Sequence, residues 1–224
     1  MINYFLLNNN DQGFLGLLAF VLAYFLALAI AFTVHEFAHA FVANKFGDNT
    51  AKALGRLSLN PLKHISGTGF LMFLLFGFGW AKPVEINPLK FTNYKKGMAW
   101  VSLAGIIANF ITFFLFAGFY LLFLLFSAET YTNMFQVFFD QFLLYSITLN
   151  ITLAVFNLLP IYPLDGFNFI SVFMKDTNPY VVFMRKYGVL VLLLFLLTPL
   201  FEILLGFIFS MFTGMFSFIY ALFL

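Results

Sequence analysis

The sequence contains no cysteine, and charged residues make up only 9% of its 224 residues. Without thiols the chain forms no disulfide, and any bound metal must be held by imidazole and carboxylate groups. The formal net charge of +2 is too small to indicate nucleic-acid binding, so we expect no nucleic-acid partner. Histidine is scarce too, with three in the chain, so the position of each one is informative.

Apolar residues, by contrast, make up 63% of the chain, phenylalanine alone occurs 37 times, and the mean hydropathy is +0.99. A soluble core needs far less apolar surface, so the composition predicts an integral membrane protein surrounded by the lipid bilayer. We expect an all-α polytopic fold in which residues 1–224 form a single domain.

Long apolar runs predict the membrane spans, at residues 13–46, 98–126 and 134–158. The final run, 189–224, is broken at Pro199 and Glu202, and is either one tilted span with an interfacial tail or two short spans. A signal peptide is the alternative for the first run, because it contains a small-residue sequence, Ala29-Ile30-Ala31, that resembles a cleavage site. Residues 1–12 carry no Lys or Arg, however, and the run is too long, which favours a span.

The stretch at 67–80 is apolar but short and rich in glycine, so we expect a re-entrant or interfacial element that does not cross. The flanking residues 55–60 and 82–87 alternate with period 2, which predicts short strands. A re-entrant or β-hairpin element is therefore expected between the first and second spans.

The most specific motif is His35-Glu36-Phe37-Ala38-His39, at the end of the first span. On a helix the two histidines project from one face, so both rings reach one tetrahedral metal while Glu36 faces its bound water. A chance match is the alternative. It is disfavoured because residues 13–34 of the same span contain no Asp, Glu, Lys, Arg or His. A charge within a bilayer costs about 2.5 to 3.5 kcal/mol, so two histidines and a glutamate at the end of this span would be costly without a metal or partner.

Two histidines leave a catalytic zinc one protein ligand short of the usual three. Asp165 is the best candidate, because it lies in a proline-bounded turn after the third span and is followed by Gly166. Glu85 is a second candidate. A plain Asp-Gly turn without a metal is the alternative for Asp165.

Other polar residues leave two interpretations open. Asn157 either hydrogen-bonds the oxyanion of a tetrahedral intermediate, as a catalytic group, or makes a helix cap or an interhelical bond. His64 is expected in an interfacial loop, with a role in the site as the alternative. Gly105 and Asn109 are explained by close helix packing and interhelical polar contacts.

The positions of basic residues predict the topology. The loops at 45–96 and 175–186 are basic, whereas residues 1–12 and 127–133 have no Lys or Arg. The positive-inside rule therefore places the N-terminus outside and the active site toward the cytoplasmic side. If residues 67–80 do not cross the membrane, the His35–His39 pair and Asp165 lie at the same depth in the bilayer.

Taken together, the His-Glu-x-x-His motif and the later sequence Asn157-Leu-Leu-Pro160-Ile-Tyr-Pro163-Leu-Asp165-Gly166 resemble those of the site-2 protease family of intramembrane zinc metalloproteases. Residues 55–61, 79–84 and 87–88 resemble a compact bacterial branch of that family, without a PDZ or CBS module. Two departures are Ile106, where the family has proline, and Phe167-Asn168 after the Asp-Gly pair.

The resemblance implies a three-helix catalytic core over about residues 13–175 in a bacterial inner membrane. It also implies one zinc ion (Zn2+) held by His35, His39 and Asp165, with Glu36 as the catalytic base, and substrates that are transmembrane segments of other membrane proteins. A homo-oligomer is left open. The alternative function is a non-hydrolytic zinc-binding membrane protein, either a metal transporter or a silent partner subunit; the presence of Glu36 argues against the silent form.

Overall fold

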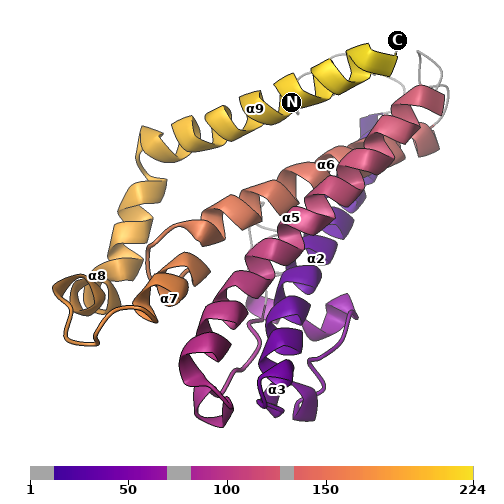
Figure 1. Cartoon of the computed structure of the whole chain (residues 1–224). Coiled ribbons are helices and arrows are strands. Elements are labelled where there is room, and N and C mark those ends of the chain that lie inside the picture. Colours follow the sequence, from indigo (N-terminus) through magenta and orange to yellow (C-terminus); the bar gives the residue numbers. More distant parts are fainter. Residues whose placement is uncertain (1–12, 70–81, 127–133, 224) are drawn as a thin grey trace.

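The structure, a computed structural model, describes residues 13–69, 82–126 and 134–223, and these are helical almost throughout (Figure 1). The elements, in order, are α2 (Gly13–Lys45), α3 (Thr50–Ala53), the 3-10 turns η1 (Pro61–Lys63) and η2 (Pro88–Lys90), α5 (Tyr94–Phe126), α6 (Met134–Leu158), α7 (Asp165–Ser171), α8 (Pro179–Leu196) and α9 (Pro199–Phe223). The predicted all-α class is confirmed.

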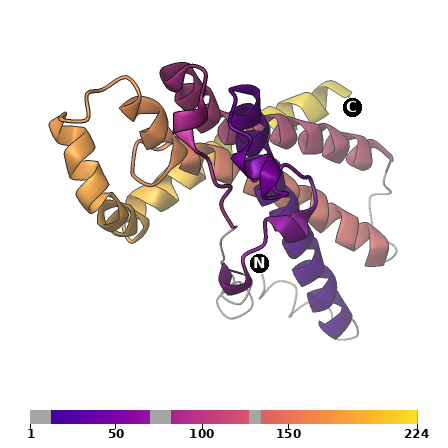
Figure 2. The same cartoon turned by 90° about the horizontal axis from the view of Figure 1, so that it is seen from below.

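Within the described ranges, the four helices α2, α5, α6 and α8 are long and apolar enough to cross a membrane. The first three agree closely with the predicted spans. They run side by side as a three-helix core, which both views show (Figures 1 and 2). The chain is thus an integral membrane protein in which three of these helices carry the core.

A stripe of small residues lets α2 pack closely on its neighbours. Ala23, Ala27 and Ala31 are fully buried and recur every fourth residue, which keeps them on one face of the helix. His35 and His39 continue the same spacing and are also buried, at 7% and 6% exposure. The face of α2 that packs in the core therefore becomes, toward its end, the face that presents both imidazoles.

The final apolar region forms two helices. α8 begins at Pro179, with the Asn178 side chain accepting a hydrogen bond from the Tyr180 amide, and α9 begins at Pro199. The described part of α9 returns across the core, where Ile208 packs among Phe113, Ile147 and their neighbours (Figure 1). The structure has two helices with the break just before Pro199, of which α8 is long enough to cross a membrane and the described apolar part of α9 is shorter, so both arrangements stay predictions.

The expected strands are not formed. Residues 55–60 and 82–87 are irregular, and several of their backbone groups bond to side chains instead of to one another. The amides of Val84 and Asn87 donate to the carboxylates of Glu36 and Asp48, and the Pro83 carbonyl accepts from Arg56. The proposed re-entrant segment falls largely on residues 70–81, which lie outside the described residues, so it stays a prediction.

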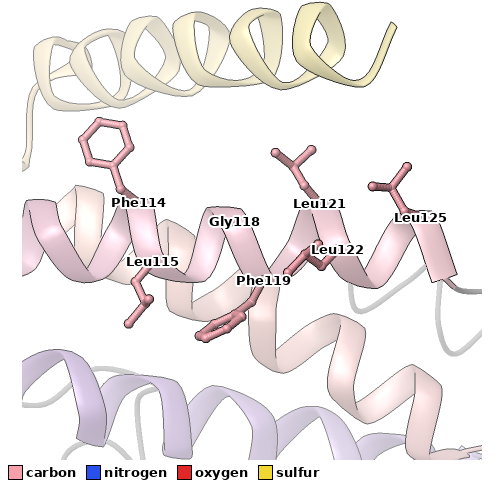
Figure 3. Close-up of a pocket in the computed structure, with 7 residues that line it drawn as sticks. All are labelled: Phe114, Leu115, Gly118, Phe119, Leu121, Leu122 and Leu125. Atoms are coloured by element: carbon pink, nitrogen blue, oxygen red, sulfur yellow. The ribbon is translucent and has the colours of Figure 1, made fainter. Parts of the chain in front are cut away.

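The C-terminal half of α5 carries an apolar surface pocket of about 510 Å³, and the described residues that line it all belong to that helix. Figure 3 shows side chains from Phe114 to Leu125 projecting on both sides of the helix, with Gly118 between them. Phe114, Leu115 and Leu122 are each more than half exposed, as suits a surface in contact with lipid.

Candidate metal centre

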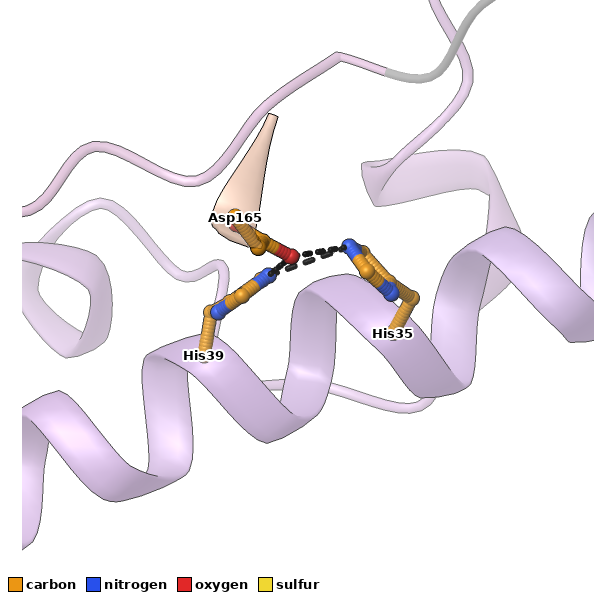
Figure 4. A group of neighbouring side chains, drawn as sticks. All are labelled: His35, His39 and Asp165. Carbon is orange, nitrogen blue, oxygen red and sulfur yellow. Dashed lines mark hydrogen bonds and ion pairs between the residues drawn. The ribbon is translucent and has the colours of Figure 1, made fainter. Parts of the chain in front are cut away.

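Two distant parts of the chain meet at one point, where α2 supplies His35 and His39 and the first residue of α7 supplies Asp165 (Figure 4). The two Nε2 atoms are 3.0 Å apart, and each is 3.2 Å from Asp165 Oδ2. Ligand atoms on a tetrahedral zinc with bonds of about 2.1 Å are roughly 3.4 Å apart. The spacing therefore fits a single metal ion.

Hydrogen bonds on the far side of each ring fix where the imidazole protons lie. His39 Nδ1 is 2.8 Å from the Val101 carbonyl, which only accepts. His35 Nδ1 is 2.7 Å from Asn109 Oδ1, and the orientation of Asn109 is set by its Nδ2, which donates to the Ala31 carbonyl and to Asn150. These acceptors favour the tautomer that carries its proton on Nδ1, which in a neutral ring leaves Nε2 free to face inward, as in metal-binding histidines.

The third ligand atom has the same character. It is Oδ2 of the Asp165 carboxylate, an oxygen that accepts and does not donate. No hydrogen-bond donor reaches its buried Oδ2 in the described structure. Three such atoms within 3.2 Å of one another are an unfavourable arrangement unless a cation or a proton lies among them. Nitrogen and oxygen donors in this number suit zinc.

Two glycines allow these parts to approach. A Cβ atom on Gly105 of α5 would lie 2.6 Å from both His35 Nδ1 and His39 Nε2. One on Gly166 would overlap the carbonyl of Leu158 at the end of α6. Helix α7 can therefore fold back against α6 and bring Asp165 to the histidines only because both positions lack a side chain.

Glu36 lies beside the cluster and is held from outside its own helix. Its Oε2 accepts a 2.8 Å hydrogen bond from the Val84 amide. The Val84 side chain packs with Ala40 and Ala51, while the neighbouring Asn87 amide donates to Asp48 at 2.6 Å. The hydrogen bond between Val84 and Glu36 joins residues 48 apart in the sequence, and no pattern in the sequence predicts it.

The cluster and Glu36 line one cavity of about 400 Å³, together with residues of the 83–88 segment and of α5. Asn157 lines it as well, and its Nδ2 donates to the Leu153 carbonyl of its own helix at 3.0 Å, so neither interpretation of this residue is settled. Asn168, one turn beyond Asp165, also lines the cavity, and the sequence analysis gave it no role. Its i+3 spacing from Asp165 was the available signal.

The remaining candidates lie away from the cluster. His64 is 1% exposed, and its Nε2 donates to the Ser58 carbonyl at 2.7 Å, outside the lining of the metal cavity. Glu85 is exposed and takes no part in the three-residue group. Ile106 lies within an unbroken α5, so the missing proline leaves that helix regular.

A membrane protein with a His-His-Asp cluster beside a glutamate belongs to a class of membrane-embedded metalloenzymes. Over residues 23–200 the chain matches the model of peptidase family M50. It belongs to that family, the site-2 protease family, as the resemblance of its motifs predicted.

Curated relatives agree with this assignment. The chain is 41% identical over 177 residues, which is 78% of this chain and 80% of the relative, to “Putative zinc metalloprotease YwhC” of Bacillus subtilis. It is 29% identical over 194 residues, 84% of this chain and 70% of the relative, to “Putative zinc metalloprotease Rip2” of Mycolicibacterium smegmatis. The Rip2 of Mycobacterium tuberculosis is 29% identical over 178 residues, 76% of this chain and 64% of the relative. No solved structure matches the chain.

Proposed function

We propose that this metalloprotease uses one zinc ion, held by His35, His39 and Asp165, to hydrolyse peptide bonds in or near transmembrane segments of other membrane proteins. The observation that carries the proposal is the convergence of three candidate ligand atoms beside the carboxylate of Glu36 in one cavity. The zinc in the names of the relatives and the donor set of this site support the same metal.

When bound, zinc at such a site lowers the pKa of a water molecule toward about 7 and polarises a carbonyl group. Glu36 acts as the general base, taking the proton of the attacking water and returning it to the leaving amide nitrogen. The Val84 amide orients the Glu36 carboxylate for this exchange. Asn109 and the Val101 carbonyl hold the imidazoles in the tautomer that leaves Nε2 free for the metal.

Substrate binding requires an extended peptide, because a helix hides its carbonyls in its own hydrogen bonds. The irregular 83–88 segment forms one wall of the cavity, and we expect the substrate to lie extended along it. We place this wall and the site on the cytoplasmic side of the bacterial inner membrane, on the basis of the basic loops. Water then reaches the cavity from that side.

The test distinguishes the role of the general base from the role of the metal ligands by substituting each in turn. Glu36→Gln should keep zinc and lose cleavage, whereas His35→Ala and Asp165→Ala should lose both. Glu202→Gln, the same change at an exposed position on α9, is the matched control and should keep both.

Zinc content is measured by elemental analysis of the purified variants, and cleavage by mass spectrometry of single-span membrane proteins incubated in reconstituted vesicles. Equal zinc loss in Glu36→Gln and Asp165→Ala would contradict the assigned roles. Cleavage by Glu36→Gln at the wild-type rate would remove the general base from the mechanism.

A further inference from the structure

A second cavity, of about 340 Å³, lies beside the loop that follows α3. Three basic side chains line it, from Arg56, Lys63 and Lys82, and none of its lining residues is acidic. Among the residues that the structure describes, none of these three side chains forms an ion pair. The cavity therefore concentrates positive charge that nothing in the described chain neutralises.

Arg56 is the decisive member of this group. It is only 8% exposed, and the one hydrogen bond of its guanidinium runs from Nη1 to the Pro83 carbonyl at 3.0 Å. A guanidinium carries five donors in a planar fork that matches the oxygens of a phosphate or carboxylate. Burying such a charge without a counter-charge is costly, so an anion in the cavity would compensate it.

The surroundings of the cavity indicate where that anion comes from. Leu54 and Leu62 also line it, and they are 51% and 78% exposed. Exposed leucines beside basic side chains are typical of a surface that sits at the level of lipid head groups. Basic residues at the cytoplasmic surface of a membrane are attracted to its anionic lipids.

We propose that this cavity binds a phosphate group, and that the phosphate is the head group of an anionic phospholipid. Arg56 makes the bidentate contact from the buried side, while the exposed ammonium groups of Lys63 and Lys82 close over the phosphate. The leucines rest on the acyl region of the same lipid. This site is separate from the metal cavity, since the two share no lining residue.

The geometry also connects the two cavities. Arg56 holds the carbonyl of Pro83, and the next residue, Val84, donates to Glu36. An anion bound to Arg56 therefore stabilises the segment that orients the catalytic base. This connection rests on the proposed proteolysis, whereas binding of the lipid does not, so binding is the property to measure.

The test compares two double variants that remove the same charge. Lys63→Gln with Lys82→Gln removes two cavity lysines and keeps Arg56 on Pro83, while Lys95→Gln with Lys96→Gln removes two exposed lysines at the start of α5. Retention of phosphatidylglycerol by the purified full-length protein is titrated by native mass spectrometry, with phosphatidylcholine as the neutral lipid. We expect binding about 30-fold weaker in the cavity variant and near wild type in the other.

Inorganic phosphate separates the two sources of the ligand. If phosphate alone protects the protein against thermal unfolding and displaces the lipid, the site takes free phosphate; if only the lipid protects, it takes the head group. Equal weakening in both double variants would mean a diffuse surface attraction and would overturn the proposal, as would unchanged binding in both. If the double variant does not fold, the single variants Lys63→Gln and Lys82→Gln replace it in the titration. Each is expected to weaken binding about fivefold.

Discussion

The proposed metal centre should be destroyed by adding one methyl group against the two imidazoles. Gly105→Ala places a Cβ atom 2.6 Å from His35 Nδ1 and from His39 Nε2. To reach an ordinary contact of 3.4 Å, the rings must move by about 0.8 to 1.0 Å, because His35 Cε1 lies closer still, at 2.4 Å. Metal sites tolerate about 0.2 Å in their bond lengths, so the displacement is several times too large.

Two effects of this substitution oppose one another. Replacing glycine by alanine inside a helix stabilises it by about 1 kcal/mol, whereas overpacking a filled site costs about 1 to 3 kcal/mol. We therefore expect a modest net loss of fold stability but a loss of zinc affinity of about 100-fold or more, which is the upper end seen when the partners of metal ligands are altered. Folding and metal binding should thus respond very differently.

Gly118→Ala is the matched control, on the same helix and with no atom within 4 Å of the added Cβ. It should keep zinc and raise the unfolding temperature slightly. The assay is competition for zinc against a chelator of known affinity, with thermal unfolding measured on the same samples. Zinc affinity in Gly105→Ala equal to that of the wild type would refute the geometry of the site, and so would equal losses in both variants.

Three further predictions address the surroundings of the site. Asn109→Leu leaves the Nδ1 proton of an imidazole without its acceptor and should weaken zinc binding by about 10- to 100-fold in the same competition assay, while Thr112→Val, one turn away, should not. Burial raises the pKa of Asp48, but hydrogen bonds from the Thr50 hydroxyl and from two amides lower it further, to below 3.8. Its stabilising effect is therefore present above about pH 4 and is lost as the pH falls below that; Asp48→Asn should be less stable at pH 7 and show a flatter thermal-unfolding profile between pH 2 and 5. Finally, a cysteine at Ser58 should react only with reagents that reach the cytoplasm, and one at Phe126 only from outside; the reverse pattern would invert the proposed topology.

The helices could be predicted from the sequence because hydropathy and helix-ending residues act locally. The third span was predicted at its observed bounds, and α2 ends where Gly47 adopts a φ of +104°, a conformation that favours glycine. The histidine pair could be predicted from spacing alone, since a helix fixes which residues share a face. The meeting of Asp165 with that pair followed from the topology.

Contacts between distant segments could not be predicted in the same way. The alternation at 82–87 was interpreted as a strand, but here it reflects a segment whose Val84 side chain enters the core while its amide bonds Glu36. The tight fit of Gly105 against both imidazoles depends on how α2 and α5 are packed, which no residue of either helix reveals alone. Arg56 likewise looked like one more basic loop residue until its burial was known.

The division of the proposed ligands between α2 and α7 has a consequence for the synthesis and membrane insertion of the protein. The histidines enter the membrane with the first helix, but the third ligand is made only after α5 and α6 have been added. A chain still on the ribosome therefore carries an incomplete site and cannot cut the helices emerging beside it. On the proposed ligand set, the order of synthesis therefore delays activity until α7 has folded against the first helix.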